Sequence, residues 1–174
     1  PYREALERMW VLEPLAAWAP TSSHLNRLVS APKHHLADPA LAARLVGVGR
    51  DSLLAGQGAD SVPRDGTFLG GLFESLTALS LRVFAQAADA SVAHFRTRAG
   101  EHEVDFILER DDRRVVACEV KLTETVTNRD TRHLTWLQER LGSQLLDAVV
   151  VTTGRFAYRR PDGIGVVPLA LLGP

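Results

Sequence analysis

Three ionisable residues occupy positions from which they could act together: Asp105, Glu119 and Lys121. Asp105 lies within Glu103–Glu109, where every second residue from Val104 is apolar, and the other two occupy alternate positions in the largely apolar run Val115–Leu122. Alternation with a period of two predicts two strands, and the short segment between them predicts a hairpin. On one face of a hairpin, two acids and a lysine could bind a cation and activate water.

The pairing of the two apolar strand faces predicts which residues lie opposite each other. A three-residue loop places Phe106 opposite Cys118, on the apolar side. The same register places Asp105 directly opposite Glu119. Facing Cβ atoms lie about 4.5–5.5 Å apart, so two carboxylates there need a cation, a shared proton or a salt bridge. This arrangement suits Mg²⁺ or Mn²⁺, with the two acids as ligands and Lys121 assisting a water molecule.

Glu74 is the only charged residue from Gly66 to Leu81. It lies in a predicted helix from Phe68 to Ala88 that is expected to be buried on most sides. Because a buried carboxylate needs compensation, Glu74 is expected either beside the Asp105–Glu119 pair or in a structural ion pair with an arginine. The candidate arginines for this ion pair are Arg96 and Arg98. The stripe of this helix that faces the core is predicted to comprise Leu72, Leu76, Leu79 and Val83.

The elements that position these residues follow the long helix. Strands are predicted at residues 92–97, 103–109, 115–122 and 148–153, with a short one at 166–167, and helices at 128–141 and 169–172. A meander of three strands, then a helix and a parallel strand, is an α/β pattern. The expected fold class is therefore α/β, with a mixed sheet flanked by helices.

The amino-terminal part predicts a small appendage. Helices are predicted at residues 1–12 and from Pro39 to Gly47, the second capped by Asp38, and short extended pieces at 11–15 and 34–37. About 48 residues of this kind are too few for an independent core, which is typical of the tail of an upstream, winged-helix-like segment. The glycine-rich stretch that follows predicts a loop. The expected divisions are an appendage at 1–48, a linker at 49–66 and the main domain at 67–174.

A basic face is predicted on the helix at residues 128–141, opposite a stripe of leucines. Basic groups interleaved with an aromatic ring can hold phosphates and stack a base. The alternative is a solvated face with Trp136 at the edge of the core. The candidate nucleic-acid contacts are Arg96, Arg98, Arg129, His133, Trp136 and Arg140.

The composition sets limits on function. The 174 residues are 45% hydrophobic and 24% charged, with a net charge of −1, so any contact with nucleic acid must come from local patches. A single cysteine excludes an internal disulfide and fits a reducing cytoplasm. No apolar run is expected to reach the roughly 20 residues that span a bilayer, so no membrane partner is expected. The start at Pro1 is interpreted as that of a fragment of a longer protein or of a processed chain.

Asp105, a gap of thirteen residues and then Glu119-Val120-Lys121 resemble the D…ExK signature of the PD-(D/E)XK nuclease superfamily. Glu74 is similar to the extra acid common in that superfamily, whereas Val104 replaces the usual proline before the first acid. Further motifs resemble an uncharacterised bacterial family whose members place this region after an AAA-type P-loop ATPase domain. These motifs are Pro32-Lys33, Asp38-Pro39-Ala40-Leu41, Gly71-Leu72-Phe73-Glu74, Arg96-Thr97-Arg98 and Glu103-Val104-Asp105-Phe106.

The resemblance implies a restriction-endonuclease-like fold, an ATPase domain upstream in the same polypeptide and a metal site to which the Val120 carbonyl contributes. Two functions follow as hypotheses. The first is a Mg²⁺-dependent phosphodiesterase acting on DNA or RNA, with Glu74 supporting the site. The second is a non-catalytic regulatory module that binds nucleic acid or protein and retains the nuclease fold.

Overall fold

A computed structural model describes residues 2–20, 31–54, 67–97 and 100–173. The chain divides into two compact units that are interleaved in sequence. The first unit comprises Pro1–Pro14 and His34–Leu79, and the second comprises Leu15–Lys33 and Ser80–Pro174. The expected divisions at residues 48 and 66 stay predictions.

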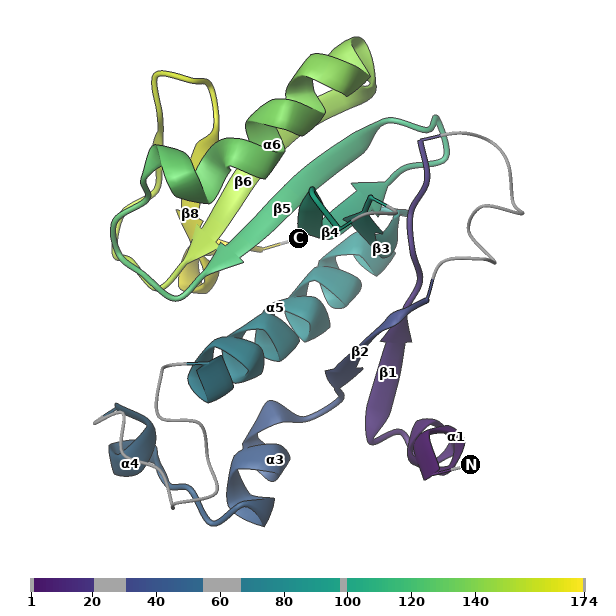
Figure 1. Cartoon of the computed structure of the whole chain (residues 1–174), viewed down its shortest axis with the longest axis vertical. Coiled ribbons are helices and arrows are strands. Elements are labelled where there is room, and N and C mark those ends of the chain that lie inside the picture. The colour runs from purple at the N-terminus through teal and green to yellow at the C-terminus, as the bar shows by residue number, and fades with distance from the viewer. Residues whose placement is uncertain (1, 21–30, 55–66, 98–99, 174) are drawn as a thin grey trace. The chain divides into compact units, whose positions relative to one another are not determined.

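The second unit is built on a six-stranded mixed sheet with the order β3-β4-β5-β6-β8-β7 (Figure 1). Its strands are β3 (Ser91–Arg96), β4 (Glu103–Glu109), β5 (Val115–Lys121), β6 (Leu145–Thr152), β7 (Tyr158–Arg159) and β8 (Gly165–Pro168). The first three form an antiparallel meander, β5, β6 and β8 run parallel, and β7 returns antiparallel to β8. The predicted α/β class with a mixed sheet is confirmed; of these strands, only β7 was not predicted.

The hairpin of β4 and β5 has the predicted register. Phe106 pairs with Cys118, and Leu108 pairs with Val116. This pairing places Cys118 in the interior, where burial raises the pKa of its thiol to about 12. Cys118 is therefore a small core residue and not a nucleophile at neutral pH.

Helix α6 (Asn128–Leu141) packs on β4, β5 and β6 and lies along β5 and β6 in Figure 1. Asp130 accepts hydrogen bonds from the backbone N–H and the hydroxyl of Thr127, which fixes the start of the helix. Leu134 and Leu137 are buried, as the leucine stripe predicts. The helix ends at Gly142, whose φ of 51° favours glycine. Two short 3₁₀ turns, η1 (Gly142–Gln144) and η2 (Leu169–Leu171), follow α6 and β8.

Residues far ahead of β3 in sequence complete the core of this unit. The backbone N–H of Trp18 donates to the His94 carbonyl at 2.7 Å, and the backbone N–H of His94 donates to the Ala16 carbonyl at 2.9 Å. The Trp18 ring meets Phe95 edge-on, with centroids 5.9 Å apart. Trp18 is 4% exposed and belongs to the same core as Ile107.

The remaining short elements lie mainly in the first unit. They are α1 (Tyr2–Arg8), the two-stranded sheet of β1 (Leu12–Leu15) and β2 (Lys33–Leu36), α3 (Pro39–Leu45) and α4 (Arg50–Leu54). As predicted, the Asp38 carboxylate caps α3 and accepts from the Ala40 N–H at 2.9 Å. The first helix is shorter than predicted because Trp10, at φ 58°, has a left-handed backbone. Helix α4 occupies part of the predicted loop, whose residues 55–66 lie outside the described residues.

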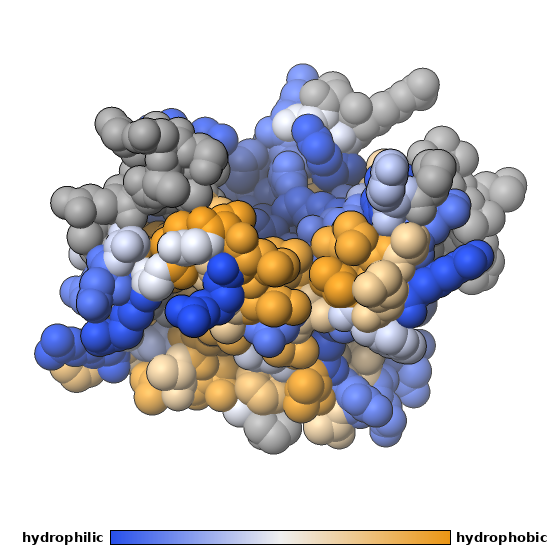
Figure 2. Space-filling model, turned by 90° about the horizontal axis from the view of Figure 1, so that it is seen from below, coloured by the Kyte–Doolittle hydropathy of each residue, from blue (hydrophilic) through white to orange (hydrophobic). Residues whose placement is uncertain are grey.

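The long helix α5 (Thr67–Ala87) buries a different stripe from the predicted one. Leu72, Ala78, Leu81 and Ala85 are buried, whereas Leu76, Leu79 and Val83 are exposed. The prediction is wrong for those three because hydrophobicity alone does not decide which stripe is buried, and small alanines on the buried side allow close approach. Hydrophobic residues also gather on the face shown in Figure 2.

The segment Phe68–Ala87 is, by length and composition alone, long and apolar enough to cross a membrane. Its 20 residues include only two charged ones, Glu74 and Arg82. The expectation that no apolar segment reaches that length is therefore wrong. The core helix of a soluble protein can have the same length and composition, so these two properties alone are weak evidence for a membrane span.

Candidate functional site

The second unit brings Asp105, Glu119 and Lys121 together. Asp105 Oδ2 accepts the backbone N–H of Val120 at 2.9 Å, which orients its carboxylate at the β5 strand. Lys121 Nζ lies 3.1 Å from Glu119 Oε2. The side chains of Glu119, Asp105 and Lys121 are 3%, 16% and 32% exposed, so solvent reaches the group from the lysine side.

A second lysine lies at this site. Lys33 Nζ is 2.7 Å from Glu103 Oε1 and 3.2 Å from Asp105 Oδ1. Glu103 is also approached by Arg96, whose Nε lies 3.7 Å from Oε2. The sequence indicates Lys33 only as part of a family motif. The scarcity of lysine could have drawn attention to it, since only two of the 20 basic residues are lysines.

Burial and charge shift the proton affinities of these groups. Burial, and then the nearby charge of Asp105, raise the pKa of Glu119 from 4.5 to about 8, although Lys121 opposes the shift. Burial lowers the pKa of Lys121, but the charges of Glu119 and Asp105 outweigh it and the pKa is raised overall. Glu119 therefore holds its proton to a higher pH than an ordinary glutamate.

The donor set fits a hard divalent cation. Glu119 Oε1 is buried and, among the described residues, accepts no hydrogen bond. An oxygen in this state, beside a second carboxylate, is one that a cation would satisfy. No cluster of three acids, histidines or cysteines suited to a metal occurs in the described part of the chain, so solvent would have to complete the shell, as Mg²⁺ tolerates.

Of three other candidate residues, only Arg96 is placed near the site by a described contact. Glu74 is half-buried on α5, as expected, but it lies in the first unit, so its support of the Asp105–Glu119 pair stays a prediction. Arg96 is exposed and contacts Glu103. Arg98 lies outside the described residues.

A family model described as a domain of unknown function, DUF4143, matches residues 69–172. The chain belongs to the DUF4143 family. None of the curated proteins and none of the solved structures matches it. The DUF4143 match includes Asp105, Glu119 and Lys121, whereas Lys33 and Trp18 lie before it.

The basic face of α6 in the DUF4143 domain is organised around Trp136. The ring of His102 stacks on Trp136 with centroids 4.0 Å apart, and the Arg140 guanidinium lies 4.4 Å from the Trp136 centroid. His133 Nδ1 lies 3.4 Å from His102 Nδ1, and His133 Nε2 accepts from Arg132 Nε at 3.0 Å. Burial and the neighbouring Arg132 lower the pKa of His133. Arg129 is exposed on the same helix. Trp136 packs at the edge of the core, as the second of the two sequence-based alternatives predicts.

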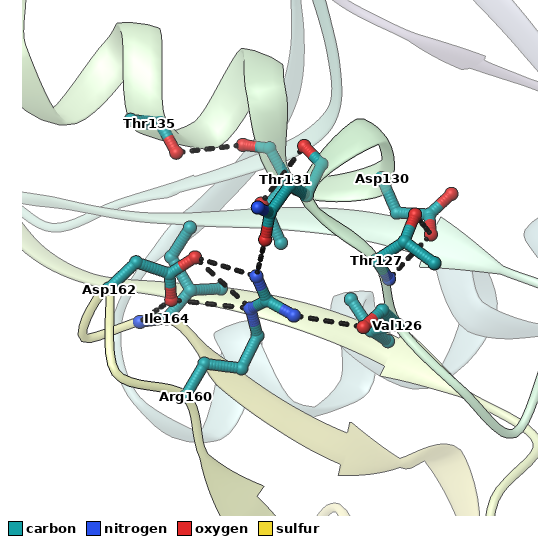
Figure 3. Close-up of polar contacts among 9 residues, drawn as sticks. Val126, Thr127, Asp130, Thr131, Thr135, Arg160, Asp162 and Ile164 are labelled. Carbon is teal, nitrogen blue, oxygen red and sulfur yellow. Dashed lines mark hydrogen bonds and ion pairs between the residues drawn. The ribbon is translucent and has the colours of Figure 1, made fainter.

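Arg160 holds the loop that joins β5 to α6 (Figure 3). Its Nη1 donates to the Val126 carbonyl at 2.8 Å, and its Nη2 donates to Asn128 Oδ1 at 2.6 Å and to Asp162 Oδ2 at 3.0 Å. The side chain is 12% exposed. Because this loop begins directly after Lys121, Arg160 helps to fix the end of the strand that carries the candidate site.

Substituting Lys for Arg160 is expected to lower the free energy of unfolding by about 2–3 kcal/mol, because one ammonium cannot replace a fork of charge-assisted hydrogen bonds. Urea denaturation would measure the change. Arg155→Lys, at an exposed position, is the control and should leave the free energy of unfolding unchanged. Equal stability of the two variants would show that the Arg160 contacts contribute little.

Proposed function

We propose that the DUF4143 domain of this chain is a metal-dependent phosphodiesterase of the PD-(D/E)XK nuclease type, acting on DNA or RNA. One observation carries the proposal: the buried Glu119 Oε1 accepts no hydrogen bond from the described residues and lies beside Asp105. The position of Lys121 on the same carboxylate adds support. The antiparallel hairpin within a mixed sheet is consistent with a restriction-endonuclease-like fold.

In this function Asp105 and Glu119 hold Mg²⁺ or Mn²⁺, with the Val120 carbonyl as a further ligand. A bound ion supplies positive charge against the phosphate and makes water at the site more acidic. Lys121 orients that water or contacts a phosphate oxygen through its ammonium group. Glu74 is the further supporting acid that the resemblance implies for this site.

The nucleic acid is held by local basic groups, since the net charge of −1 gives no general attraction. Arg129, His133 and Arg140 on α6 contact phosphates, together with Arg96 on β3. Arg98, which lies outside the described residues, is a further proposed contact. Trp136 holds Arg140 in place. The domain works in the cytoplasm, attached to an AAA-type ATPase domain upstream in the same polypeptide.

A second candidate is a non-catalytic regulatory module of that ATPase, which binds nucleic acid or protein. The specific observation in its favour is that each acid already has an ammonium partner, Lys33 for Asp105 and Lys121 for Glu119. A site neutralised in this way is stable without a cation. The two candidates differ in whether a cation binds and whether a phosphodiester bond is cleaved.

Millimolar Mg²⁺ or Mn²⁺ is expected to raise the melting temperature of the chain. One bound ion at 100 times its Kd adds about 2.7 kcal/mol to the free energy of unfolding. Asp105→Asn should abolish the increase, whereas Asp111→Asn, in the exposed hairpin loop, should keep it. An identical melting temperature with and without each ion would contradict the metal site.

Cleavage is the second part of the test. Labelled single-stranded and double-stranded DNA and RNA should be cut only when the ion is present. Glu119→Gln and Lys121→Ala should abolish cutting while circular dichroism shows a folded chain. If a cation binds but no cutting is seen, the upstream ATPase segment and ATP are added. If cutting is still absent, the result favours the regulatory module.

A further inference from the structure

Lysine is concentrated at one place in this chain. Lys33 and Lys121 are its only lysines, whereas 18 of the 20 basic residues are arginines. Both ammonium groups contact the carboxylates of the candidate site. Arginine grips a carboxylate with two parallel N–H groups, whereas an ammonium is a compact and strongly hydrated charge on a flexible stem. An ammonium is therefore the basic group that more readily leaves a carboxylate.

Both oxygens of Asp105 have donors. Oδ1 accepts from Lys33 Nζ at 3.2 Å, and Oδ2 accepts from the Val120 N–H at 2.9 Å. A cation that binds Asp105 competes with one of these two donors. The backbone N–H of Val120 is held in β5 within the sheet, whereas the Lys33 side chain can rotate away.

The two lysines differ in whether the carboxylate that they contact keeps an oxygen without a donor. Lys121 bonds one oxygen of Glu119, and the other oxygen, Oε1, accepts no hydrogen bond from the described residues. Lys33 instead completes the pairing of Asp105. It also has a second acid at hand, because Glu103 Oε1 lies only 2.7 Å from Nζ. Lys33 can therefore leave Asp105 without losing an ionic partner.

We propose that Lys33 is a displaceable counter-ion of Asp105. It neutralises this carboxylate when no divalent cation is bound, and cation binding moves it from Asp105 to Glu103. The proposal rests on the proposed metal site. It states that Lys33 sets the cation concentration at which that site is filled. Lys33 acts by positioning charge and is not a ligand of the cation.

The rarity of lysine provides a direct measurement on the unaltered chain. Selective ¹³C and ¹⁵N labelling of lysine gives signals from two side chains only, which Lys33→Arg assigns. Titration with Mg²⁺ should shift the Lys33 Cε and Nζ signals in a saturable way, at the concentrations that raise the melting temperature. A Lys33 signal that stays fixed while Mg²⁺ raises the melting temperature would overturn the proposal and leave the metal site in place.

Substitution gives the second measurement. Lys33→Met removes the ammonium and should tighten the apparent Kd for Mn²⁺, obtained by calorimetry, about tenfold, the equivalent of one charge-assisted hydrogen bond. Arg155→Met, which removes an exposed basic group that has no part in the proposed site, should leave this Kd unchanged.

The outcomes separate the two proposals. A Kd for Lys33→Met equal to that of the wild type would overturn the role of Lys33 only. No binding by either folded protein would overturn both the metal site and the role of Lys33. Binding by Lys33→Met alone would show that Lys33 blocks the cation instead of yielding to it, and would overturn the displacement. If Lys33→Met fails to fold, the lysine signals of the wild type still decide the matter.

Discussion

Replacing Trp18 with Ala is expected to lower the free energy of unfolding by about 3–4 kcal/mol. The side chain is 4% exposed, and it packs edge-on against Phe95 in the core of the second unit. Loss of a buried indole removes apolar contact and leaves a cavity. The value lies at the lower end of the range for tryptophan, because the buried Nε1 has no hydrogen-bond partner among the described residues. Removing the indole therefore also removes the cost of burying an unsatisfied donor.

Urea denaturation would measure this loss. Far-ultraviolet circular dichroism is the suitable signal, because removing a tryptophan changes the fluorescence of the chain. Trp10→Ala is the matched control, since Trp10 is 79% exposed, and it should change the free energy of unfolding by less than about 0.5 kcal/mol. If Trp18→Ala were as stable as Trp10→Ala, the segment around Trp18 would not belong to the core of the sheet.

Glu119→Gln is expected to change how stability depends on pH. The folded chain holds the Glu119 proton up to a pKa of about 8, whereas the ordinary value is 4.5. Between these values the folded state binds more protons than the unfolded state, so the free energy of unfolding falls as pH rises and levels off above about pH 8. A glutamine at this position has no proton to lose. The variant should therefore gain about 3–4 kcal/mol relative to the wild type between about pH 5 and about pH 8.5.

The measurement is a series of urea denaturations in the presence of a chelator, so that no divalent cation supplies the missing charge. Lys121 stays protonated throughout this range, and its effect is a constant offset between the two proteins. Glu101→Gln, at an exposed position, should follow the wild-type profile. A stability difference between Glu119→Gln and the wild type that is the same at every pH would show that Glu119 is ionised at neutral pH.

Local patterns were sufficient to predict the sheet that carries the candidate site. The period of two along β4 and β5 predicted their faces, and the short loop predicted their register, so that Phe106 pairs with Cys118 as expected. Helix α6 followed from its leucines and from Gly142 at its end. Each of these features depends on residues close together in sequence, where turn geometry and periodicity act directly.

Features that depend on distant partners were not predicted. Nothing near Trp18 or Lys33 in sequence indicates that one joins the core of the sheet and the other bonds Asp105. The predicted stripe of α5 is wrong for the same reason, because the choice between Leu79 and Ala78 depends on what packs there. For the site, the sequence supplied the two acids and Lys121, but not the second ammonium group that neutralises them.

The interleaving of the two units determines the order in which the second unit can assemble during synthesis. Lys33 precedes Asp105 by 72 residues, so at about 5–20 residues per second it is made about 4–14 s before its partner. Trp18 likewise emerges before β3, the strand along which it lies. The growing chain must therefore keep the segment from Leu15 to Lys33 available until the hairpin of β4 and β5 has left the ribosome.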